Sequence, residues 1–250
     1  MKTLSEPGLS VRLEPGPQGV PRTVIRPDGS RFLPLTGRIL EAPPKTLTGW
    51  PTLQVANWKK HTTDRLVLSS IRNGVTLPFS GKAPRPQILR QHHLSEEDVR
   101  CLDEKFMEFA RLGVIRRAFR LYLVSPVFVV HQASKDREIF NAVHLNGFLH
   151  YQHFKMESLA TVKALVRSGD WALKVDISKM YNTFRLHPSH TKFVQFYWPG
   201  TNELWEYVGC PFGLSLLPRL MTRIMKTVVR WIRRRGFRCC IYLDDILVLD

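Results

Sequence analysis

The sequence predicts an α+β fold in which an antiparallel sheet is backed by helices. Two apolar stretches, 173–176 and 239–249, have the length and β-prone composition of strands. Two longer stretches, 95–112 and 214–235, repeat apolar residues every three to four positions, which is the spacing of amphipathic helices. Turn-forming residues such as those at 199–202 separate the strand-like stretches and predict hairpins.

The composition indicates a basic protein with a sizeable core. The chain has 250 residues, of which 44% are hydrophobic, and 37 Lys and Arg against 21 Asp and Glu give a net charge of +16. Such a charge favours a polyanionic partner, most often nucleic acid, and an anionic membrane surface is the alternative. We expect no membrane partner, because no apolar run reaches membrane-spanning length and no signal peptide opens the chain.

The cysteines indicate a reducing environment. None of the four shows Cys-x-x-Cys spacing, and the adjacent Cys239 and Cys240 point to opposite faces of a predicted strand, which favours packing over pairing. We therefore expect an intracellular protein, in the cytoplasm or nucleus, that is not secreted.

The elements of the first half follow in chain order. Residues 1–49 are rich in Pro and Gly, which predicts a flexible leader or the end of an upstream coding segment. A short helical stretch follows within 50–85. Ser95 and Asp98 have capping-box form at the start of the helix over 95–112, and Gly113 is placed to end it. Strands are expected at 124–130 and 138–140.

The second half predicts a short helix at 158–167, the strand at 173–176, a hairpin at 192–208, and a long helix that Gly236 ends. The polar face of this helix is rich in cations with few acids to balance them. Contact with a nucleic-acid backbone is one interpretation, and a solvated face is the other. The candidate backbone-binding residues are Arg219, Arg223, Lys226 and Arg230.

Three aspartates stand where predicted strands end or turn. Asp176 closes one strand, while Asp244 and Asp245 lie between two apolar stretches, which predicts a tight hairpin with both acids at its tip. Adjacent carboxylates repel each other, and a hard cation such as Mg²⁺ removes that cost. Three converging carboxylates can hold two metal ions about 3.5–4 Å apart for phosphoryl transfer. An ordinary Asp-Asp turn is the alternative.

These acids lie in motifs that resemble those of reverse transcriptases. Tyr-Leu-Asp-Asp at 242–245 has the Tyr-x-Asp-Asp form, and Asp176 followed by Tyr181 is similar to the first palm motif. Between them, Cys-Pro-Phe-Gly-Leu-Ser-Leu-Leu-Pro at 210–218 is similar to the Leu-Pro-Phe-Gly-Leu-Ser-x-Ala-Pro run of retroelement polymerases. The stretches 137–146 and 151–157 resemble DIRS-like retrotransposons, and the similarity reaches upstream to about residue 50.

The resemblance implies the fingers and partial palm of a right-hand polymerase. It places a lead-in at 50–85, fingers at 86–170 and palm at 171–250. The implied activity is RNA-directed DNA polymerisation, with dNTP, Mg²⁺ or Mn²⁺, and an RNA or DNA template with a primer. A catalytically inactive nucleic-acid-binding remnant and an RNA-dependent RNA polymerase are the alternatives.

The resemblance also implies roles for the acids. Asp176 and Asp244 would bind both metal ions, the Ile177 carbonyl could add a ligand, and Asp245 would be the more peripheral acid.

The same resemblance implies a nucleotide site. Tyr181 would lie beneath the incoming sugar and exclude a 2′-hydroxyl, with a core aromatic as the alternative. Lys135 and Arg137 match residues that grip the triphosphate, with a plain charged turn as the alternative. Phe212 and Gly213 would line the nucleotide and template side.

Two features depart from the family pattern. Met180 and Leu217 replace small residues, and overpacking costs about 1–3 kcal/mol where neighbours cannot adjust. The chain also ends soon after Asp245. We therefore expect that the thumb is absent, that residues 246–249 form an exposed apolar edge, and that the chain binds nucleic acid but extends primers poorly.

Overall fold

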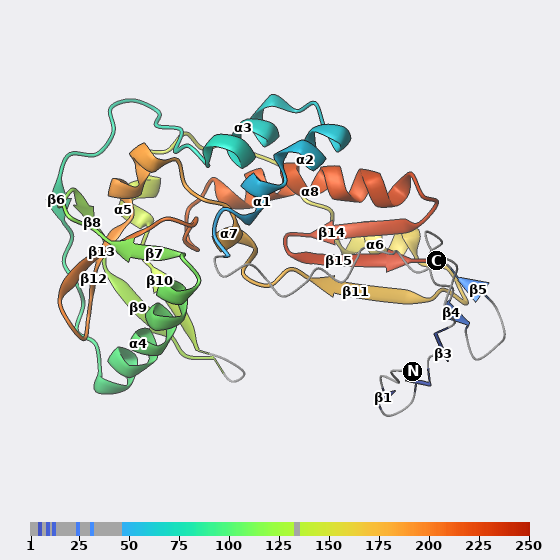
Figure 1. Cartoon of the computed structure of the whole chain (residues 1–250), viewed down its shortest axis with the longest axis horizontal. Coiled ribbons are helices and arrows are strands. Elements are labelled where there is room, and N and C mark those ends of the chain that lie inside the picture. The colour runs from blue at the N-terminus through green and yellow to red at the C-terminus, as the bar shows by residue number, and fades with distance from the viewer. Residues whose placement is uncertain are drawn as a thin grey trace. The chain divides into compact units, whose positions relative to one another are not determined.

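The computed structural model describes residues 47–132 and 136–250, together with short strands near the N-terminus (Figure 1). The chain divides into two compact units, Met1–Pro43 and Pro44–Asp250. Most of the leader predicted over 1–49 lies outside the described residues. The described strands of the first unit are β1 (Ser5–Glu6), β2 (Leu9–Ser10), β3 (Arg12–Leu13), β4 (Val24–Ile25) and β5 (Arg31–Phe32).

Three short helices open the second unit: α1 (Trp50–Leu53), α2 (Val55–His61) and α3 (Arg65–Asn73). The Asp64 side chain caps α3, because it accepts hydrogen bonds from the backbone N–H groups of the first turn. Gly74 ends the helix at φ 95°, and a Cβ there would lie 2.7 Å from the backbone of Leu186 and His187. The end of α3 therefore requires glycine for both conformation and space.

Helix α4 (Glu96–Arg111) begins as predicted. The Ser95 hydroxyl accepts from the Asp98 N–H, and the Asp98 carboxylate accepts from the Ser95 N–H, which is the reciprocal capping box. The apolar face is buried through Leu102, Phe106 and Phe109.

Within the described residues, one sheet has five strands in the order β6-β8-β12-β13-β7. The predicted hairpin at 192–208 is present as β12 and β13, joined in antiparallel register. The sheet combines strands from both sides of residue 170, where the sequence places the boundary between fingers and palm, and that boundary stays a prediction. The strands are β6 (Gln87–Ile88), β7 (Ile115–Arg117), β8 (Leu123–Val124), β12 (Gln195–Trp198) and β13 (Glu203–Tyr207).

The strand predicted at 124–130 divides into two. Its first residue, Val124, belongs to β8 in the five-stranded sheet, whereas β9 (Val127–Val130) pairs with β10 (Arg137–Phe140) in a separate sheet. Pro126 stands at the break, since proline has no N–H to donate to a ladder. One predicted strand thus serves two sheets.

A three-stranded sheet in the order β11-β15-β14 carries the aspartates (Figure 1). Its strands are β11 (Ala172–Asp176), β14 (Arg238–Tyr242) and β15 (Asp245–Leu249). The prediction that residues 246–249 form an exposed edge is wrong, because β15 pairs on both sides. The reason is that β11, far away in sequence, supplies the missing neighbour.

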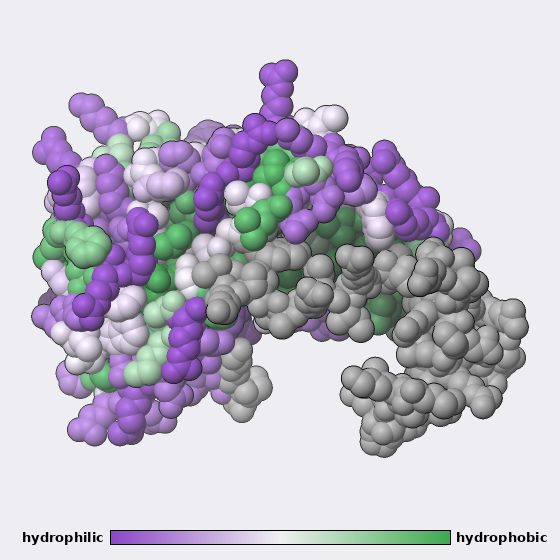
Figure 2. All heavy atoms as spheres, in the orientation of Figure 1, coloured by the Kyte–Doolittle hydropathy of each residue, from purple (hydrophilic) through white to green (hydrophobic). Residues whose placement is uncertain are grey.

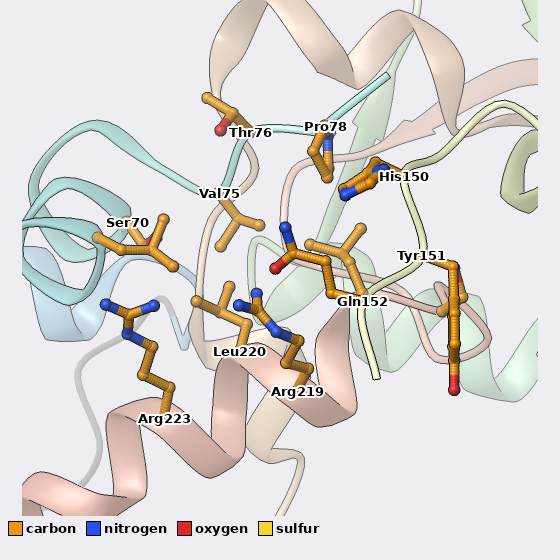
Figure 3. A pocket seen from close by; sticks show the side chains of 13 residues that line it. Ser70, Val75, Thr76, Pro78, His150, Tyr151, Gln152, Arg219, Leu220 and Arg223 are labelled. Atoms are coloured by element: carbon orange, nitrogen blue, oxygen red, sulfur yellow. The ribbon is translucent and has the colours of Figure 1, made fainter. Parts of the chain in front are cut away.

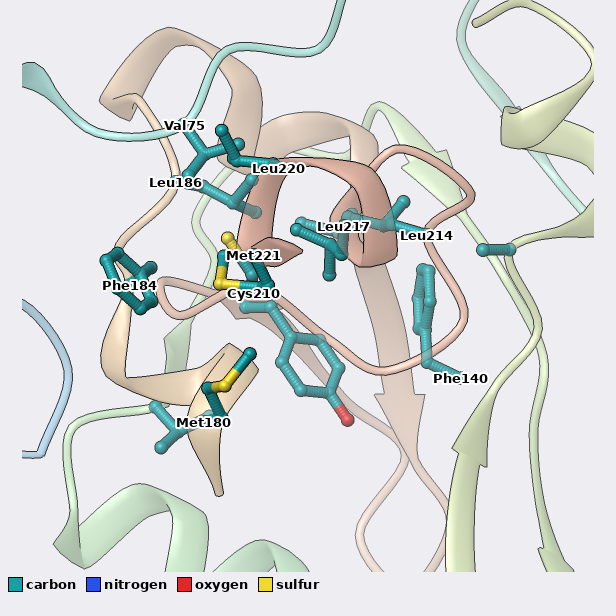
Figure 4. Close-up of a cluster of buried hydrophobic side chains, with 14 of the residues drawn as sticks. Val75, Phe140, Met180, Phe184, Leu186, Cys210, Leu214, Leu217, Leu220 and Met221 are labelled. Atoms are coloured by element: carbon teal, nitrogen blue, oxygen red, sulfur yellow. The ribbon is translucent and has the colours of Figure 1, made fainter. Parts of the chain in front are cut away.

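Helix α8 (Leu217–Arg233) packs on β14 and buries its apolar face. Pro218 lies in the first turn, where a missing N–H costs nothing, and Gly236 follows the helix at φ 89°. Met180 and Leu217, which depart from the family pattern, both lie in the buried cluster of Figure 4, at 5% and 1% exposure. The core thus has room for both large side chains.

Four shorter helices complete the described part of the second unit. No helix among the described residues is long and apolar enough to cross a bilayer. Figure 2 shows mainly hydrophilic residues on the face in view, with smaller apolar areas between them. The short helices are α5 (Val143–Asn146), α6 (Leu159–Leu165), α7 (Met180–Thr183) and a 3₁₀-helix (Pro188–Phe193).

Candidate active site

Asp244 lies at the tip of the β14–β15 hairpin. Because Tyr242 pairs with Asp245, the two residues that turn the chain are Leu243 and Asp244, and Asp245 already belongs to β15. The prediction of both acids at the tip is therefore half right. Leu243 has φ 54°, a left-handed conformation that is unusual for a branched side chain and that concentrates at functional sites.

Asp176 ends β11 and pairs directly with Asp245 across the ladder. The following residue, Ile177, donates its N–H to the carbonyl oxygen of Asp244 at 3.0 Å. This bond ties the end of β11 to the tip of the hairpin. The fold thus brings Asp176 and Asp244 to one end of the sheet, although they lie far apart in sequence.

Both acids line a cavity of about 340 Å³. Its walls come from α4, β10, the end of β11, α7 and the loop before α8. The volume is at the lower end of the range of about 300–1,000 Å³ that holds small ligands. Four other residues singled out by the sequence line the same cavity, namely Arg137, Ile177, Tyr181 and Phe212.

The three carboxylates have different surroundings. Asp176 and Asp244 are exposed, and within the described part of the chain their carboxylates accept no hydrogen bond and pair with no cation. Asp245 does not line the cavity, and its Oδ1 lies 3.0 Å from Nζ of Lys174. The hydrogen bond with Asp245 and the negative charge of that residue, with smaller contributions from Asp176 and Asp244, raise the pKa of Lys174.

The donor set fits a hard cation that a substrate completes. Mg²⁺ is usually held by one or two carboxylates together with waters and substrate phosphates. The two unpaired carboxylates beside the cavity match that requirement. Among the described residues, no three Asp, Glu, His or Cys side chains cluster closely enough to hold a metal ion alone, so the arrangement is not a closed structural site.

Tyr181 and Phe212 form an aromatic wall of the cavity. Their ring centroids lie 5.9 Å apart, with the planes inclined by 46°. Burial, and to a smaller extent the negative charge of Asp244, raises the pKa of Tyr181. The phenol therefore stays protonated at neutral pH and keeps a hydroxyl donor inside the cavity.

Cations also line the cavity. Arg137 opens β10 and reaches the cavity, whereas Lys135 lies outside the described residues. The sequence interpretation missed Lys105 and Lys179. Lys179 pairs with Glu108 at 3.0 Å, while Lys105 has no ion-pair partner among the described residues. The position of Lys105 at the border of the apolar face of α4 is the sequence feature that could have indicated its place near the cavity.

Gly213 shapes the loop that carries Phe212. Its φ is 105°, and a Cβ would lie 3.0 Å from the Phe140 carbonyl oxygen. Asn146, which the sequence interpretation assigned no role, holds the loop from the other side. Its Nδ2 donates to the Gly213 carbonyl at 2.8 Å, and its Oδ1 accepts from the Ser215 N–H at 2.9 Å. Gly213 thus acts on the cavity through the backbone and does not line it.

The four cations predicted to bind nucleic acid have separate environments. Arg223 donates to both Asp64 oxygens, at 2.6 and 3.1 Å, and so ties α8 to the start of α3. Lys226 and Arg230 line a cavity of about 200 Å³ next to Glu157.

Arg219 faces a second large cavity, of about 340 Å³, between α3 and the start of α8. Figure 3 shows its side chain directed into this space beside Gln152, with Tyr151 at the rim. Arg219 has no ion-pair partner among the described residues. Ser215 and Phe212 lie on one loop but line different cavities, so this loop separates the second cavity from the first.

Three comparisons relate the chain to known proteins. Residues 130–249 match the family model of the reverse transcriptase (RNA-dependent DNA polymerase) domain. The retrovirus-related Pol polyprotein from transposon 297 of Drosophila melanogaster is 21% identical over 171 residues, which cover 66% of this chain and 16% of that protein.

Two solved structures share the fold. The native protease–reverse transcriptase of prototype foamy virus gives a TM-score of 0.55 at 14% identity, covering 69% of this chain and 22% of that one. The foamy viral protease–reverse transcriptase in complex with dsDNA gives a TM-score of 0.57 at 20% identity, and the match covers 70% of this chain and 35% of that one. The chain thus spans between 16% and 35% of the length of these relatives.

The structural likeness confirms the predicted α+β fold of right-hand polymerase fingers and partial palm. The family match begins at the end of β9 and includes all three aspartates, Tyr181 and Phe212. Residues 130–249 thus match the reverse transcriptase family model, and the chain is similar to the Pol polyprotein of a retrotransposon.

Proposed function

We propose that this chain acts in RNA-directed DNA polymerisation, joining the α-phosphate of a dNTP to the 3′-hydroxyl of a primer on an RNA or DNA template and releasing pyrophosphate. One observation carries the proposal. Asp176 and Asp244 have no ion-pair partner among the described residues, and they line a cavity with Tyr181, Phe212 and Arg137. All five lie in the stretch that matches the reverse transcriptase family.

Asp176 and Asp244 would hold Mg²⁺, or Mn²⁺, with the Ile177 carbonyl as a further oxygen ligand and Asp245 at the periphery. When bound, two such ions lower the pKa of the attacking hydroxyl and balance the charge of the leaving group. The protein's own contribution is to keep these oxygens free, since neither carboxylate is engaged elsewhere among the described residues.

The other residues of the cavity would contact different parts of a bound nucleotide. Arg137 and Lys105 offer donors for the triphosphate, and Lys135 is proposed to do the same. The ring of Tyr181 would lie beneath the sugar, where a 2′-hydroxyl would meet it, and Phe212 would pack on the same nucleotide. Gly213 would let the loop approach closely.

Nucleic acid is the proposed macromolecular partner. The net charge of +16 supports sequence-independent attraction to phosphate. The foamy viral structure in complex with dsDNA supports the same partner by likeness of fold. Arg219 is the strongest candidate on α8, because it is directed into a cavity and has no acidic partner among the residues that the structure describes, whereas Arg223 already pairs with Asp64.

We also infer an origin in a DIRS-like element, which the stretches 137–146 and 151–157 support. An intracellular location, in the cytoplasm or nucleus, is proposed from the cysteines. The thiols of Cys101, Cys210, Cys239 and Cys240 are free.

Primer extension tests the activity. The protein is incubated with a labelled DNA primer on an RNA template, dNTP and Mg²⁺, and only slow extension of the primer is expected, as the sequence predicts. Asp176→Asn or Asp244→Asn should lower the rate by about 100-fold or more, because each removes a charged ligand oxygen. Glu104→Gln is the matched control, since Glu104 is an exposed acid of α4 that does not line the cavity.

A second measurement separates the alternatives. Binding of fluorescent dGTP is measured with Mn²⁺ in the wild type and in Asp244→Asn. Nucleotide binding that Asp244→Asn abolishes, without extension, would favour an inactive remnant. Preferential incorporation of ribonucleotides would favour an RNA polymerase. The proposal is overturned if the protein shows no metal-dependent nucleotide binding and no primer extension.

A further inference from the structure

Lys174 lies next to the acid cluster but outside the cavity. It precedes Asp176 by two residues on β11, so both side chains project from the same face of the sheet. Asp176 pairs with Asp245, which makes Lys174 a diagonal neighbour of Asp245 within reach of a long side chain. The Lys174 Nζ lies 3.0 Å from the Asp245 Oδ1.

This ion pair divides the three acids into two kinds. Asp176 and Asp244 line the cavity and have no ion-pair partner in the described part of the chain, whereas Asp245 pairs with Lys174 and does not line the cavity. The number of charged ligands tunes the affinity of a carboxylate site for divalent cations. A third free carboxylate would therefore tighten cation binding and occupy a coordination position that substrate phosphate needs.

We propose that Lys174 is a positioning residue that holds Asp245 away from the cation site and limits the charged ligands to Asp176 and Asp244. This inference rests on the proposed function, because it assumes that those two acids bind the cation. The competing explanation is a solvent-exposed ion pair with no role in cation binding. The side chains are 69% and 44% exposed, and such pairs often contribute little to stability.

Binding of Mn²⁺ alone tests the proposal. Free Mn²⁺ is titrated by electron paramagnetic resonance in five proteins: the wild type, Lys174→Met, Lys174→Arg, Asp245→Asn and the double variant Lys174→Met/Asp245→Asn. With Lys174 present, Asp245→Asn should change the affinity less than about twofold. Without Lys174, the same substitution should weaken binding by about tenfold, because Asp245 has then become a ligand.

The double-mutant cycle separates positioning from simple charge. If Lys174 only repels the cation through its charge, the effect of Asp245→Asn is the same in both backgrounds and the two substitutions add. Lys174→Arg should retain the wild-type affinity for Mn²⁺, since arginine keeps the positive charge and is long enough to contact Asp245. Lys163→Met, an exposed lysine of α6, controls for the loss of one positive charge. Thermal melts confirm that each variant folds.

Two outcomes distinguish the two proposals. If the wild type binds Mn²⁺ and Asp176→Asn or Asp244→Asn abolishes binding, but the cycle shows no coupling, only the role of Lys174 is overturned. If Mn²⁺ binding does not depend on Asp176 and Asp244, the proposed cation site fails and the Lys174 inference fails with it.

Discussion

The side chain of Asn146 holds the backbone around Gly213 by two hydrogen bonds, one donated to the Gly213 carbonyl and one accepted from the Ser215 N–H. The loop fixed in this way carries Phe212 into one cavity and Ser215 into the other. Asn146 comes from α5, so a residue of the β9–β10 side of the fold sets the position of a loop that precedes α8.

Asn146→Ala should therefore loosen this loop. Each neutral hydrogen bond contributes about 0.5–1.5 kcal/mol net, so we expect a loss of about 1–3 kcal/mol in the free energy of unfolding by urea. Binding of dGTP should weaken in parallel. Asn73→Ala is the control, because the exposed Asn73 side chain donates only to the nearby Ser69 among the described residues. Equal effects of the two substitutions would contradict the role of Asn146.

Tyr181→Val should relax the choice of sugar. The smaller side chain leaves room for a 2′-hydroxyl, so the ratio of kcat/KM for dGTP over GTP should fall. Phe184→Val is the control, since Phe184 is a buried aromatic of the same region that does not line the cavity. An unchanged ratio in Tyr181→Val would favour a purely structural role for its ring.

Leu217→Ala should destabilise the protein, although the family motif that residues 210–218 resemble has a small residue at this position. Leu217 is 1% exposed within the apolar cluster, and burying a leucine contributes about 2–5 kcal/mol relative to alanine. Urea unfolding measures the difference. Leu53→Ala, at a position 73% exposed, should change stability by less than about 0.5 kcal/mol. A stabilised Leu217→Ala would show instead that the core is overpacked.

Arg219→Gln should weaken binding to a single-stranded RNA oligonucleotide. Each phosphate contact adds about 0.9 or less to the slope of log affinity against log salt, so the slope should become shallower by roughly that amount. Fluorescence anisotropy at several salt concentrations measures it. Arg111→Gln, an exposed arginine that lines neither cavity, is the control for net charge. Identical slopes for the two variants would remove Arg219 from the nucleic-acid interface.

Stability should depend on pH through His131. Its Nδ1 lies 2.9 Å from Asp136 and its Nε2 lies 3.0 Å from Asp98. The hydrogen bond with Asp136, followed by that with Asp98, raises the pKa of His131 above its usual 6.5. Because the folded state binds the proton more tightly, the stabilisation is complete below the unfolded pKa and is lost as pH rises through the folded pKa.

Thermal melts between about pH 6 and pH 8 should therefore show a greater loss of stability for the wild type than for His131→Gln. The pKa of Asp98 is lowered, chiefly by Ser95, so this acid stays charged throughout the range. His92→Gln is the control, as the exposed His92 ring has no acidic partner among the described residues. If wild type and His131→Gln show the same pH dependence, His131 is not the source of the pH-dependent stability.

Local signals in the sequence predicted local structure well. The capping box of Ser95 and Asp98 fixed the start of α4, because its bonds join residues only three positions apart. Gly236 marked the end of α8 through its φ of 89°. The order of the motifs also predicted one shared site, and the structure places Asp176, Asp244, Tyr181 and Phe212 in one cavity.

Features that depend on distant pairing could not be predicted. β15 is the central strand only because β11 pairs with it, and no residue of the hairpin indicates that β11 is its neighbour. The engagement of Asp245 by Lys174 depends on the same register, and the Asn146 clamp depends on how α5 meets the loop before α8. Pro126 was visible, but the two sheets that it separates were not.

The order β11-β15-β14 has a consequence for how the protein is made. β11 and β14 are not neighbours, so neither can join a sheet until β15, the last strand of the three in sequence, has left the ribosome. A nascent chain can form α4 early from local contacts, whereas the acids of the cavity meet only after synthesis has passed residue 249. The growing polypeptide thus cannot assemble the proposed cation site before synthesis has passed residue 249.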